Sequence, residues 1–228
     1  MTNFLHSGLR TKYTNQTRRR ALLASLTAMA LAPLAACGRK PPRAQALPAG
    51  ATVLALGDSL TSGVGASADT AYPAVLQRLT GWKVVNGGVS GDTSAQALAR
   101  LPGLLQQHQP ALVIVSIGGN DFLRRQSSAT TRTNVQRICT DARASGAQVL
   151  LVAVPELSLM ATVGKLSDHA LYEEVAEELK IPLHSKGWSG VLAQERLRSD
   201  QIHANAAGYE QFAQGLVETL KTTGLLVQ

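Results

Sequence analysis

A serine that follows an apolar segment is the first candidate for chemistry in this sequence. Ser59 belongs to the tetrapeptide Gly57-Asp58-Ser59-Leu60, which comes directly after the apolar residues 52–56. A hydroxyl at the end of a buried strand can act as a nucleophile in acyl transfer, because parallel sheets bind ligands at the carboxyl ends of their strands. Gly, Asp and Ser also favour ordinary turns, so the tetrapeptide alone does not distinguish a catalytic serine from a turn.

The segments that must position this serine alternate between strand and helix patterns. Strands are expected at residues 52–56, 84–86, 111–117 and 148–154, with a short fifth at 181–184. Helices are expected at residues 72–79, 94–107 with an interruption at Pro102, 133–144, 168–179 and 204–220. Such alternation predicts a parallel sheet that is covered by helices on both faces.

Compact polar clusters follow three of the predicted strands, and a fourth precedes the last helix. They occupy residues 57–60, 87–93, 118–121 and 200–203. Parallel strands bring their carboxyl ends to one edge of a sheet, so clusters that are remote in sequence can meet there.

These four clusters resemble the sequence blocks of the GDSL family, whose members are also called SGNH hydrolases. The resemblance covers nearly all of residues 51–228 and includes Ser90-Gly91-Asp92-Thr93-Ser94, Ala99-Arg100-Leu101-Pro102 and Gly118-Gly119-Asn120-Asp121. It implies a three-layer α/β/α, flavodoxin-like fold with a mostly parallel five-stranded sheet. It also implies a serine hydrolase that cleaves acyl esters through an acyl-enzyme intermediate.

The resemblance implies a role for five residues. Ser59 is the implied nucleophile and His203 its base, since an imidazole has an ordinary pKa of about 6.5, which suits proton transfer near neutral pH. Asp200 would hold that imidazole in one tautomer. The backbone N–H groups of Ser59 and Gly91 and the side-chain amide of Asn120 are the implied oxyanion hole. Taken alone, His203 would be assigned to the surface near a helix start.

Two positions depart from the family pattern, and no cofactor motif is present. Gln201 and Ala204 stand where the family often has glycine and proline. Neither side chain takes part in proton transfer, so we expect altered loop stiffness and retained activity. The glycines near Ser59 do not form a dinucleotide fingerprint, and no phosphate-binding loop occurs. We therefore expect an enzyme without cofactor or metal.

The positive charge of the chain is concentrated at its N-terminus. The 228 residues carry a formal net charge of +7, and residues 1–46 hold eight of the 22 Lys and Arg side chains but no acid. The rest of the chain holds 14 basic and 15 acidic residues. Since nucleic-acid binding needs positive charge on the folded body, this distribution argues against a nucleic-acid partner.

Residues 1–36 have the three parts of an export signal, namely a basic start, an apolar run and a small-residue cleavage site. Leu34-Ala35-Ala36-Cys37 resembles a bacterial lipoprotein box, which implies that Cys37 is lipidated and becomes the first mature residue. Residues 17–23 also resemble a twin-arginine export motif. The alternative is a cytoplasmic protein with a disordered basic tail.

The chain therefore divides into an export signal at residues 1–36, a lipid-anchored tether at 37–50 and a hydrolase domain at 51–228. The tether is rich in proline, small and basic residues. We expect an exported, periplasmic protein that is held at a membrane by its lipidated N-terminus. The second cysteine, Cys139, has apolar neighbours at helical spacing and is expected to be a core residue.

Two other functions fit parts of the pattern. The acid and amide side chains of residues 57–58 and 119–121 resemble ligands of a two-metal phosphoesterase, but such sites usually need several histidines and only His203 is well placed. A catalytically silent lipoprotein that binds lipid or glycan with a retained hydrolase fold is the alternative from another class.

The expected substrates are small acyl esters, thioesters or lysophospholipids, with carbohydrate acetyl esters as the alternative. Residues 155–163 follow a strand end and are apolar for a loop, so they are interpreted either as a groove for an acyl chain or as a packed loop. Arg124 and Arg125 lie beside the third polar cluster, where they would meet an anionic head group or form a solvated turn.

Overall fold

A five-stranded parallel sheet is the centre of the fold. The computed structural model describes residues 44–156 and 166–227, which all belong to one compact unit. Within these residues the strand order is β2-β1-β3-β4-β5, and every neighbouring pair is parallel. The strands are β1 (Thr52–Gly57), β2 (Lys83–Gly88), β3 (Leu112–Ser116), β4 (Gln148–Val152) and β5 (Leu183–His184). This is the flavodoxin-like order, so the predicted fold class is confirmed.

The two central strands, β1 and β3, are almost entirely buried. Leu54 on β1 pairs with Val85 on β2 and with Val113 on β3. Leu54 and Val113 have no solvent-exposed surface. A strand covered on both faces needs an uninterrupted apolar sequence, which is why these strands are recognisable from composition alone.

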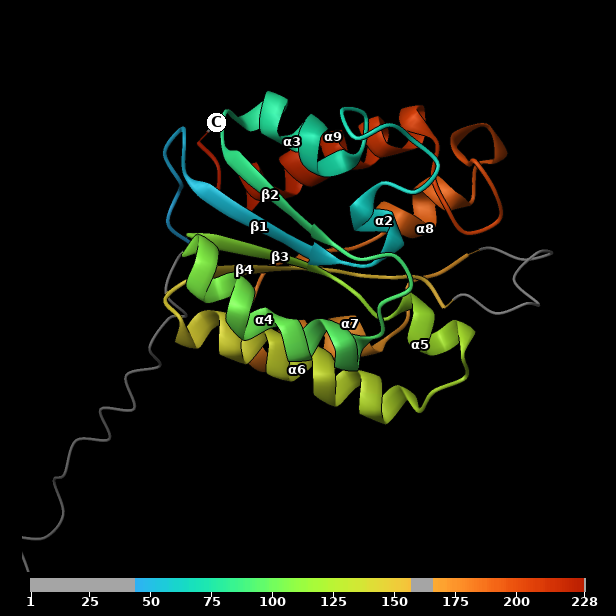
Figure 1. Cartoon of the computed structure of the whole chain (residues 1–228), viewed down its shortest axis with the longest axis horizontal. Coiled ribbons are helices and arrows are strands. Elements are labelled where there is room, and N and C mark those ends of the chain that lie inside the picture. The colour runs from blue at the N-terminus through green and yellow to red at the C-terminus, as the bar shows by residue number, and fades with distance from the viewer. Residues whose placement is uncertain (1–43, 157–165, 228) are drawn as a thin grey trace, which may run out of the picture. The chain divides into compact units, whose positions relative to one another are not determined.

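Helices cover both faces of the sheet, as predicted (Figure 1). One layer contains α2 (Ser59–Ser62), α3 (Tyr72–Thr80), α8 (Gly187–Leu192) and α9 (Ala206–Thr222). The other contains α4 (Ser94–His108), α5 (Gly119–Leu123), α6 (Ser128–Ala144) and α7 (Leu171–Leu179). A 3₁₀ turn, η2 (Glu195–Leu197), precedes the loop that leads to α9.

Three helices differ from the prediction by more than two residues or in their continuity. The expected interruption at Pro102 is wrong: α4 continues through it, because Ala97 and Leu101 are fully buried and their packing outweighs the one lost backbone hydrogen bond. Helix α6 begins five residues earlier than predicted, since its buried first-turn residue Thr131 is polar and hides the apolar period. Helix α7 begins three residues later, because Asp168 forms a β-bridge with Pro155.

Aromatic side chains fill the core between the sheet and the layer that contains α8 and α9. Trp188 and Phe212 stack with their ring centroids 3.6 Å apart, and Tyr72 meets both rings edge to face. The indole N–H of Trp188 donates to Ser116 Oγ on β3 at 2.9 Å, so its polar group is satisfied. On the opposite layer Cys139 is fully buried in α6, as predicted.

The described part of the expected tether lies against the domain. The N–H of Leu47 donates to the carbonyl of Leu225 at 2.9 Å, and the Leu47 side chain is buried. Gln45 and the Gln148 side chain exchange two hydrogen bonds of 2.8 and 2.7 Å. Residues 44–50 are therefore part of the folded body, because the apolar side chain of Leu47 is buried against it. The proline, small and basic residues around Leu47 gave no sign of this packing in the sequence. No helix among the described residues has the length and apolar character needed to span a bilayer.

Candidate active site

Ser59 is delivered to the carboxyl edge of the sheet by the end of β1. Gly57 ends this strand, and a Cβ atom on it would lie 2.5 Å from the carbonyl oxygen of Ser116 on β3. A residue without a side chain is therefore needed for the close approach of the two strands. Asp58 caps helix α2, because its Oδ1 accepts a 3.1 Å hydrogen bond from the N–H of Leu60. Ser59 is the first residue of that short helix.

Ser59, His203 and Asp200 form one chain of hydrogen bonds. Ser59 Oγ lies 3.0 Å from His203 Nε2, and His203 Nδ1 lies 2.7 Å from Asp200 Oδ2. An ionised carboxylate only accepts hydrogen bonds, so Nδ1 carries the ring proton and the lone pair of Nε2 faces the serine hydroxyl. The other oxygen of Asp200 accepts from the N–H groups of Ile202 and His203, each at 2.8 Å.

The surroundings of Asp200 keep it ionised. Partial burial opposes ionisation, but hydrogen bonds from the His203 ring and from the N–H groups of Ile202 and His203 outweigh it and hold the pKa of Asp200 below its ordinary value. The Asp200 side chain is 53% exposed, whereas that of His203 is 15% exposed. The imidazole is therefore shielded between a solvated carboxylate and the serine.

Asn120 and Gly91 lie on the two neighbouring strand ends. Asn120 Nδ2 donates to the carbonyl oxygen of Asp92 at 2.9 Å and lies 3.4 Å from Asp58 Oδ2. Asn120 also lines, together with Ser59, a small hollow of about 20 Å³. Among residues 44–156 and 166–227, neither the N–H of Ser59 nor that of Gly91 has a backbone acceptor. These two N–H groups are thus available as donors, whereas Asn120 Nδ2 already donates to Asp92 and, over a longer distance, to Asp58.

Two further carboxylates near Ser59, those of Asp58 and Asp121, are buried and accept hydrogen bonds at the starts of helices. Asp121 Oδ2 accepts from the N–H of Ser94 at 2.8 Å, and its Oδ1 accepts from the Ser94 hydroxyl at 2.5 Å, which ties α5 to the start of α4. Burial raises the pKa of Asp58 to about 7, although the hydrogen bond from the Leu60 N–H and the nearby His203 ring both act to lower it.

Two arginines contact the site, and neither contact was predicted from the sequence. Arg100, on α4, bonds to Asp92 and to the carbonyl of Gly57, and Arg124, at the end of α5, donates to the carbonyl of Gly91 at 2.9 Å. Arg124 and Arg125 are both exposed, in agreement with the expected solvated turn, and the Arg124 side chain bonds in addition to Gly91. Arg100 stands in a segment of the family resemblance, and this was the one signal for it.

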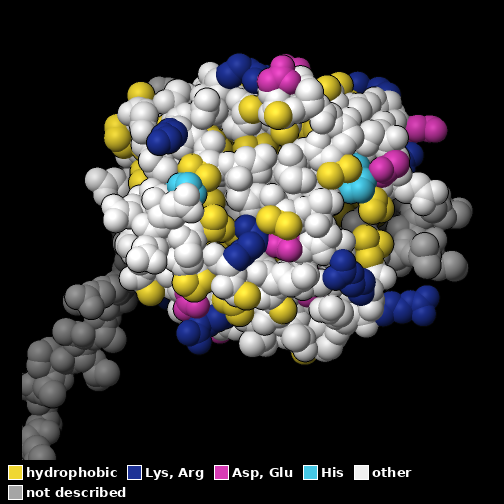
Figure 2. Space-filling model, in the orientation of Figure 1, with side chains coloured by type: hydrophobic (Ala, Val, Ile, Leu, Met, Phe, Trp, Pro, Cys, Tyr) yellow, Lys and Arg dark blue, Asp and Glu magenta, His cyan; other side chains and the backbone are white. Residues whose placement is uncertain are grey.

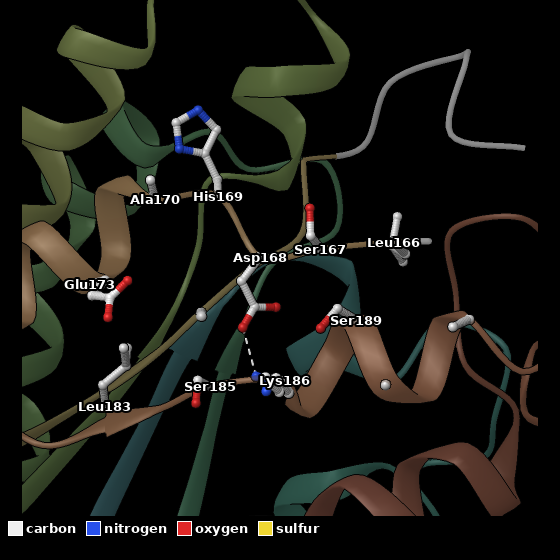
Figure 3. Close-up of a pocket in the computed structure, with 13 residues that line it drawn as sticks. Leu166, Ser167, Asp168, His169, Ala170, Glu173, Leu183, Ser185, Lys186 and Ser189 are labelled. Carbon is white, nitrogen blue, oxygen red and sulfur yellow. Dashed lines mark hydrogen bonds between the residues drawn. The ribbon is translucent and has the colours of Figure 1, made fainter. Parts of the chain in front are cut away.

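A larger hollow of about 770 Å³ lies away from Ser59, at the carboxyl ends of β4 and β5 (Figure 3). Asp168 projects into it and accepts a 2.6 Å hydrogen bond from the Lys186 N–H, while its other oxygen is buried with no partner among the described residues. The ring of His169, at the edge of this hollow, stacks on Phe122 of α5 with centroids 4.7 Å apart. None of the residues that line it belongs to the Ser–His–Asp chain.

The charged side chains are dispersed on the face of the molecule that Figure 2 shows. On the face shown in Figure 2, Lys and Arg side chains are separated from one another by neutral and acidic residues. Arg100 with Asp92, and Arg132 with Glu174 and Glu178, form ion pairs. Among the residues that the structure describes, no group of three or more His, Cys, Asp or Glu side chains is arranged to hold a metal ion.

A parallel α/β sheet with a serine, an imidazole and a carboxylate at its carboxyl edge is the architecture of an SGNH-type hydrolase. Residues 55–211 match the model of the GDSL-like lipase/acylhydrolase family, and the chain belongs to this family of hydrolases. The predicted family and enzyme class are therefore confirmed.

Named relatives and a solved structure agree with this assignment. The chain is 41% identical over 160 residues to thioesterase 1/protease 1/lysophospholipase L1 of Escherichia coli K12, which covers 68% of this chain and 76% of that protein. It is 35% identical over 181 residues to esterase TesA of Pseudomonas aeruginosa, with 75% and 88% covered. A crystal structure of TesA superposes with a TM-score of 0.67 at 34% identity and covers 75% of this chain and 99% of that one.

Two expectations fall outside the described residues. Cys37 and the whole of the export signal precede residue 44, and residues 157–163 of the expected acyl groove are also not described. Lipidation of Cys37 and an acyl groove at residues 155–163 stay predictions.

Proposed function

We propose that this protein hydrolyses acyl esters with Ser59 as nucleophile, His203 as general base and acid, and Asp200 as the residue that orients the imidazole. The observation that carries the proposal is the 3.0 Å distance from Ser59 Oγ to His203 Nε2, with Asp200 on the other ring nitrogen. This is the arrangement that converts a weakly nucleophilic hydroxyl into an effective one.

The first half of the reaction acylates the serine. Ser59 Oγ attacks the ester carbonyl carbon while its proton passes to His203 Nε2, and the carbonyl electron pair becomes an oxyanion. The bond to the leaving alcohol or thiol then breaks, and the imidazolium returns the proton to the leaving group. Asp200 stabilises the imidazolium, since its low pKa keeps it negatively charged throughout.

The second half releases the acid. Water takes the place of the leaving group, and its oxygen attacks the acyl carbon while its proton passes to His203 Nε2. The second oxyanion then collapses, the bond from the acyl carbon to Ser59 Oγ breaks, and the imidazolium returns the proton to Ser59 Oγ. In both halves the oxyanion would be stabilised by the N–H groups of Ser59 and Gly91 and by Asn120 Nδ2. Each such donor typically contributes about 100- to 1,000-fold in rate.

The proposed substrates are carboxylic esters, thioesters or lysophospholipids, as the names of the relatives suggest. The hollow beside Ser59 is lined by the apolar side chains of Leu60, Leu123 and Ile202. The small volume of this hollow favours esters with a short acyl chain. Acetyl esters, including those of carbohydrates, are therefore the second candidate substrates.

The decisive experiment compares the full chain with its Ser59→Ala variant on p-nitrophenyl esters of increasing acyl length, an acyl thioester, a lysophospholipid and an acetylated sugar. Loss of Ser59 should lower turnover by several orders of magnitude with the fold intact by circular dichroism. Retention of more than a few per cent of turnover would refute the mechanism. Activity that a chelator removes would indicate the metal-dependent phosphoesterase. A lack of turnover with every substrate would indicate the catalytically silent lipoprotein.

We further propose that residues 1–36 direct export and that Cys37 carries a lipid, which would hold the domain at a membrane. The support is the order of basic, apolar and small residues before Cys37. Mass spectrometry of the N-terminal peptide from envelope fractions tests this proposal. A lipid mass on Cys37 that is absent from Cys37→Ala is the expected result, and an unmodified N-terminus that begins at Met1 would contradict it.

A further inference from the structure

One guanidinium group joins two walls of the proposed oxyanion hole. Arg100 Nε donates to Asp92 Oδ2 at 2.6 Å, and Arg100 Nη2 donates to the carbonyl oxygen of Gly57 at 2.8 Å. Gly57 lies two residues before Ser59, and Asp92 directly follows Gly91. The same side chain therefore holds the strand end that carries one backbone donor and the loop that carries the other.

The third donor is connected to this pair through the backbone of Asp92. Its carbonyl oxygen accepts the 2.9 Å hydrogen bond from Asn120 Nδ2, which turns the amide nitrogen, not the amide oxygen, toward this side of the site. The Gly57 carbonyl also accepts from the N–H of Val89 at 3.1 Å, so the loop 89–92 is fastened to β1 at both of its ends.

We propose that Arg100 is a positioning residue of the oxyanion hole: its fixed planar fork sets the spacing between the N–H of Ser59, the N–H of Gly91 and the amide of Asn120. The proposal rests on the ester-hydrolase function proposed above. Electrostatic catalysis depends on donors that are already in place when charge develops on the substrate, so a rigid connection between them lowers the barrier of the chemical step without itself binding substrate.

The chemistry of the contacts explains why arginine occupies this position. The two acceptors, a carboxylate oxygen and a carbonyl oxygen, are met by two N–H groups of one rigid plane, which a lysine ammonium cannot reproduce. Arg100 is 24% exposed and Asp92 only 9% exposed in their side chains, so this pair is better shielded than the usual surface ion pair. Its donors are directed at the protein and not at the hollow beside Ser59, which Arg100 does not line.

The test measures kcat and KM on a p-nitrophenyl ester for the full chain and for Arg100→Gln, Arg100→Lys, Asn120→Ala and the double variant Arg100→Gln/Asn120→Ala. We expect Arg100→Gln to lower kcat by about 10- to 100-fold with KM within about threefold, and Arg100→Lys to fall between it and the parent protein. In the Asn120→Ala background the same change should cost only a few fold, because both act on one set of donors.

Arg132→Gln is the matched control. Arg132 also bridges two groups, Glu174 and Glu178, but it joins α6 to α7 and does not line the hollow beside Ser59. It should lower the melting temperature without changing kcat. If Arg100→Gln does not fold, Asp92→Asn removes the charge from the same contact and should give the same loss in kcat.

The positioning role is overturned if Arg100→Gln keeps kcat within about twofold of the parent protein. It is also overturned if Arg132→Gln lowers kcat as much for the same drop in melting temperature. A double variant whose loss in kcat is the full product of the two single losses would contradict it as well. Failure of the function itself looks different. The parent protein would then lack esterase activity, or Ser59→Ala would retain it.

Discussion

Ser59 Oγ and His203 Nε2 lie within hydrogen-bonding distance although 144 positions separate the two residues in the chain. The serine is held by the end of β1, and the histidine by a short loop whose ends are joined by the bridge between Arg198 and Ala204. Asn205 stabilises that loop, because its side chain accepts a hydrogen bond from the N–H of Gly208 and donates one to the carbonyl of Arg198. Two locally rigid turns therefore meet at one sheet edge.

Replacement of Asp200 by Asn tests the orienting carboxylate. The amide cannot supply negative charge to the imidazolium and favours the wrong tautomer of His203, so kcat for an aryl ester should fall by about 1,000-fold or more. Glu210→Asn, an exposed carboxylate on α9, serves as the control and should leave kcat unchanged. A variant with kcat within tenfold of the parent would mean that the solvated Asp200 is dispensable.

Replacement of Asn120 by Ala tests the oxyanion donor. The variant loses a side-chain donor beside Ser59 while the backbone donors remain, so kcat should fall by about 100-fold and KM should change little. Asn134→Ala is the matched control, since Asn134 also donates from Nδ2, to Ser94 Oγ at 2.9 Å, but does not line the hollow. Equal losses in the two variants would show a general packing effect and no specific role.

Replacement of Asp58 by Asn should change how stability depends on pH. Burial raises the pKa of Asp58 to about 7 from a model-peptide value of 3.8, so the folded protein keeps a proton that the unfolded chain has already lost between these values. The Asp58 contribution to the free energy of unfolding therefore falls as pH rises from about 4 to about 7, by at most about 4 kcal/mol. Urea denaturation of both proteins across this range measures the difference, and a constant difference would contradict the prediction.

Replacement of His184 by Leu should change the pH dependence of stability in the opposite direction. Burial lowers the pKa of His184 from 6.5 to about 4, with a smaller opposing effect of Asp168, and its ring bonds through Nδ1 to Thr219 Oγ1 at 2.7 Å. In the unfolded chain His184 binds a proton below about pH 6.5, whereas in the folded protein it binds one only below about pH 4. The parent protein should thus lose about 3 kcal/mol relative to the variant as pH falls through this window, and none above pH 7.

The same denaturation series tests this second titration. Because His184 and Asp58 act in opposite directions over overlapping ranges, the parent protein alone will show a shallow pH profile, and only the two variants separate them. A stability difference between the parent protein and His184→Leu that does not vary between pH 4 and pH 7 would contradict the assignment.

The amino-acid sequence by itself determined the alternation of strands and helices and the residue types of the site. Buried parallel strands such as β1 and β3 are uninterrupted apolar runs, and their ends are marked by glycine-rich polar clusters, so both are local patterns that need no knowledge of the fold. The family blocks added the expected partners of Ser59, because four clusters in order are far more specific than any one of them.

Tertiary structure alone decided the contacts that depend on which segments meet. Helix α4 passes through Pro102 because its buried face is held by the sheet, and Leu47 belongs to the body because it meets Leu225 from the other end of the chain. The contacts of Arg100 with Gly57 and Asp92 could not be inferred from periodicity, since they join residues 43 and eight positions apart across two loops. The physical reason is that contacts between separate segments are set by three-dimensional distance, which local sequence patterns do not encode.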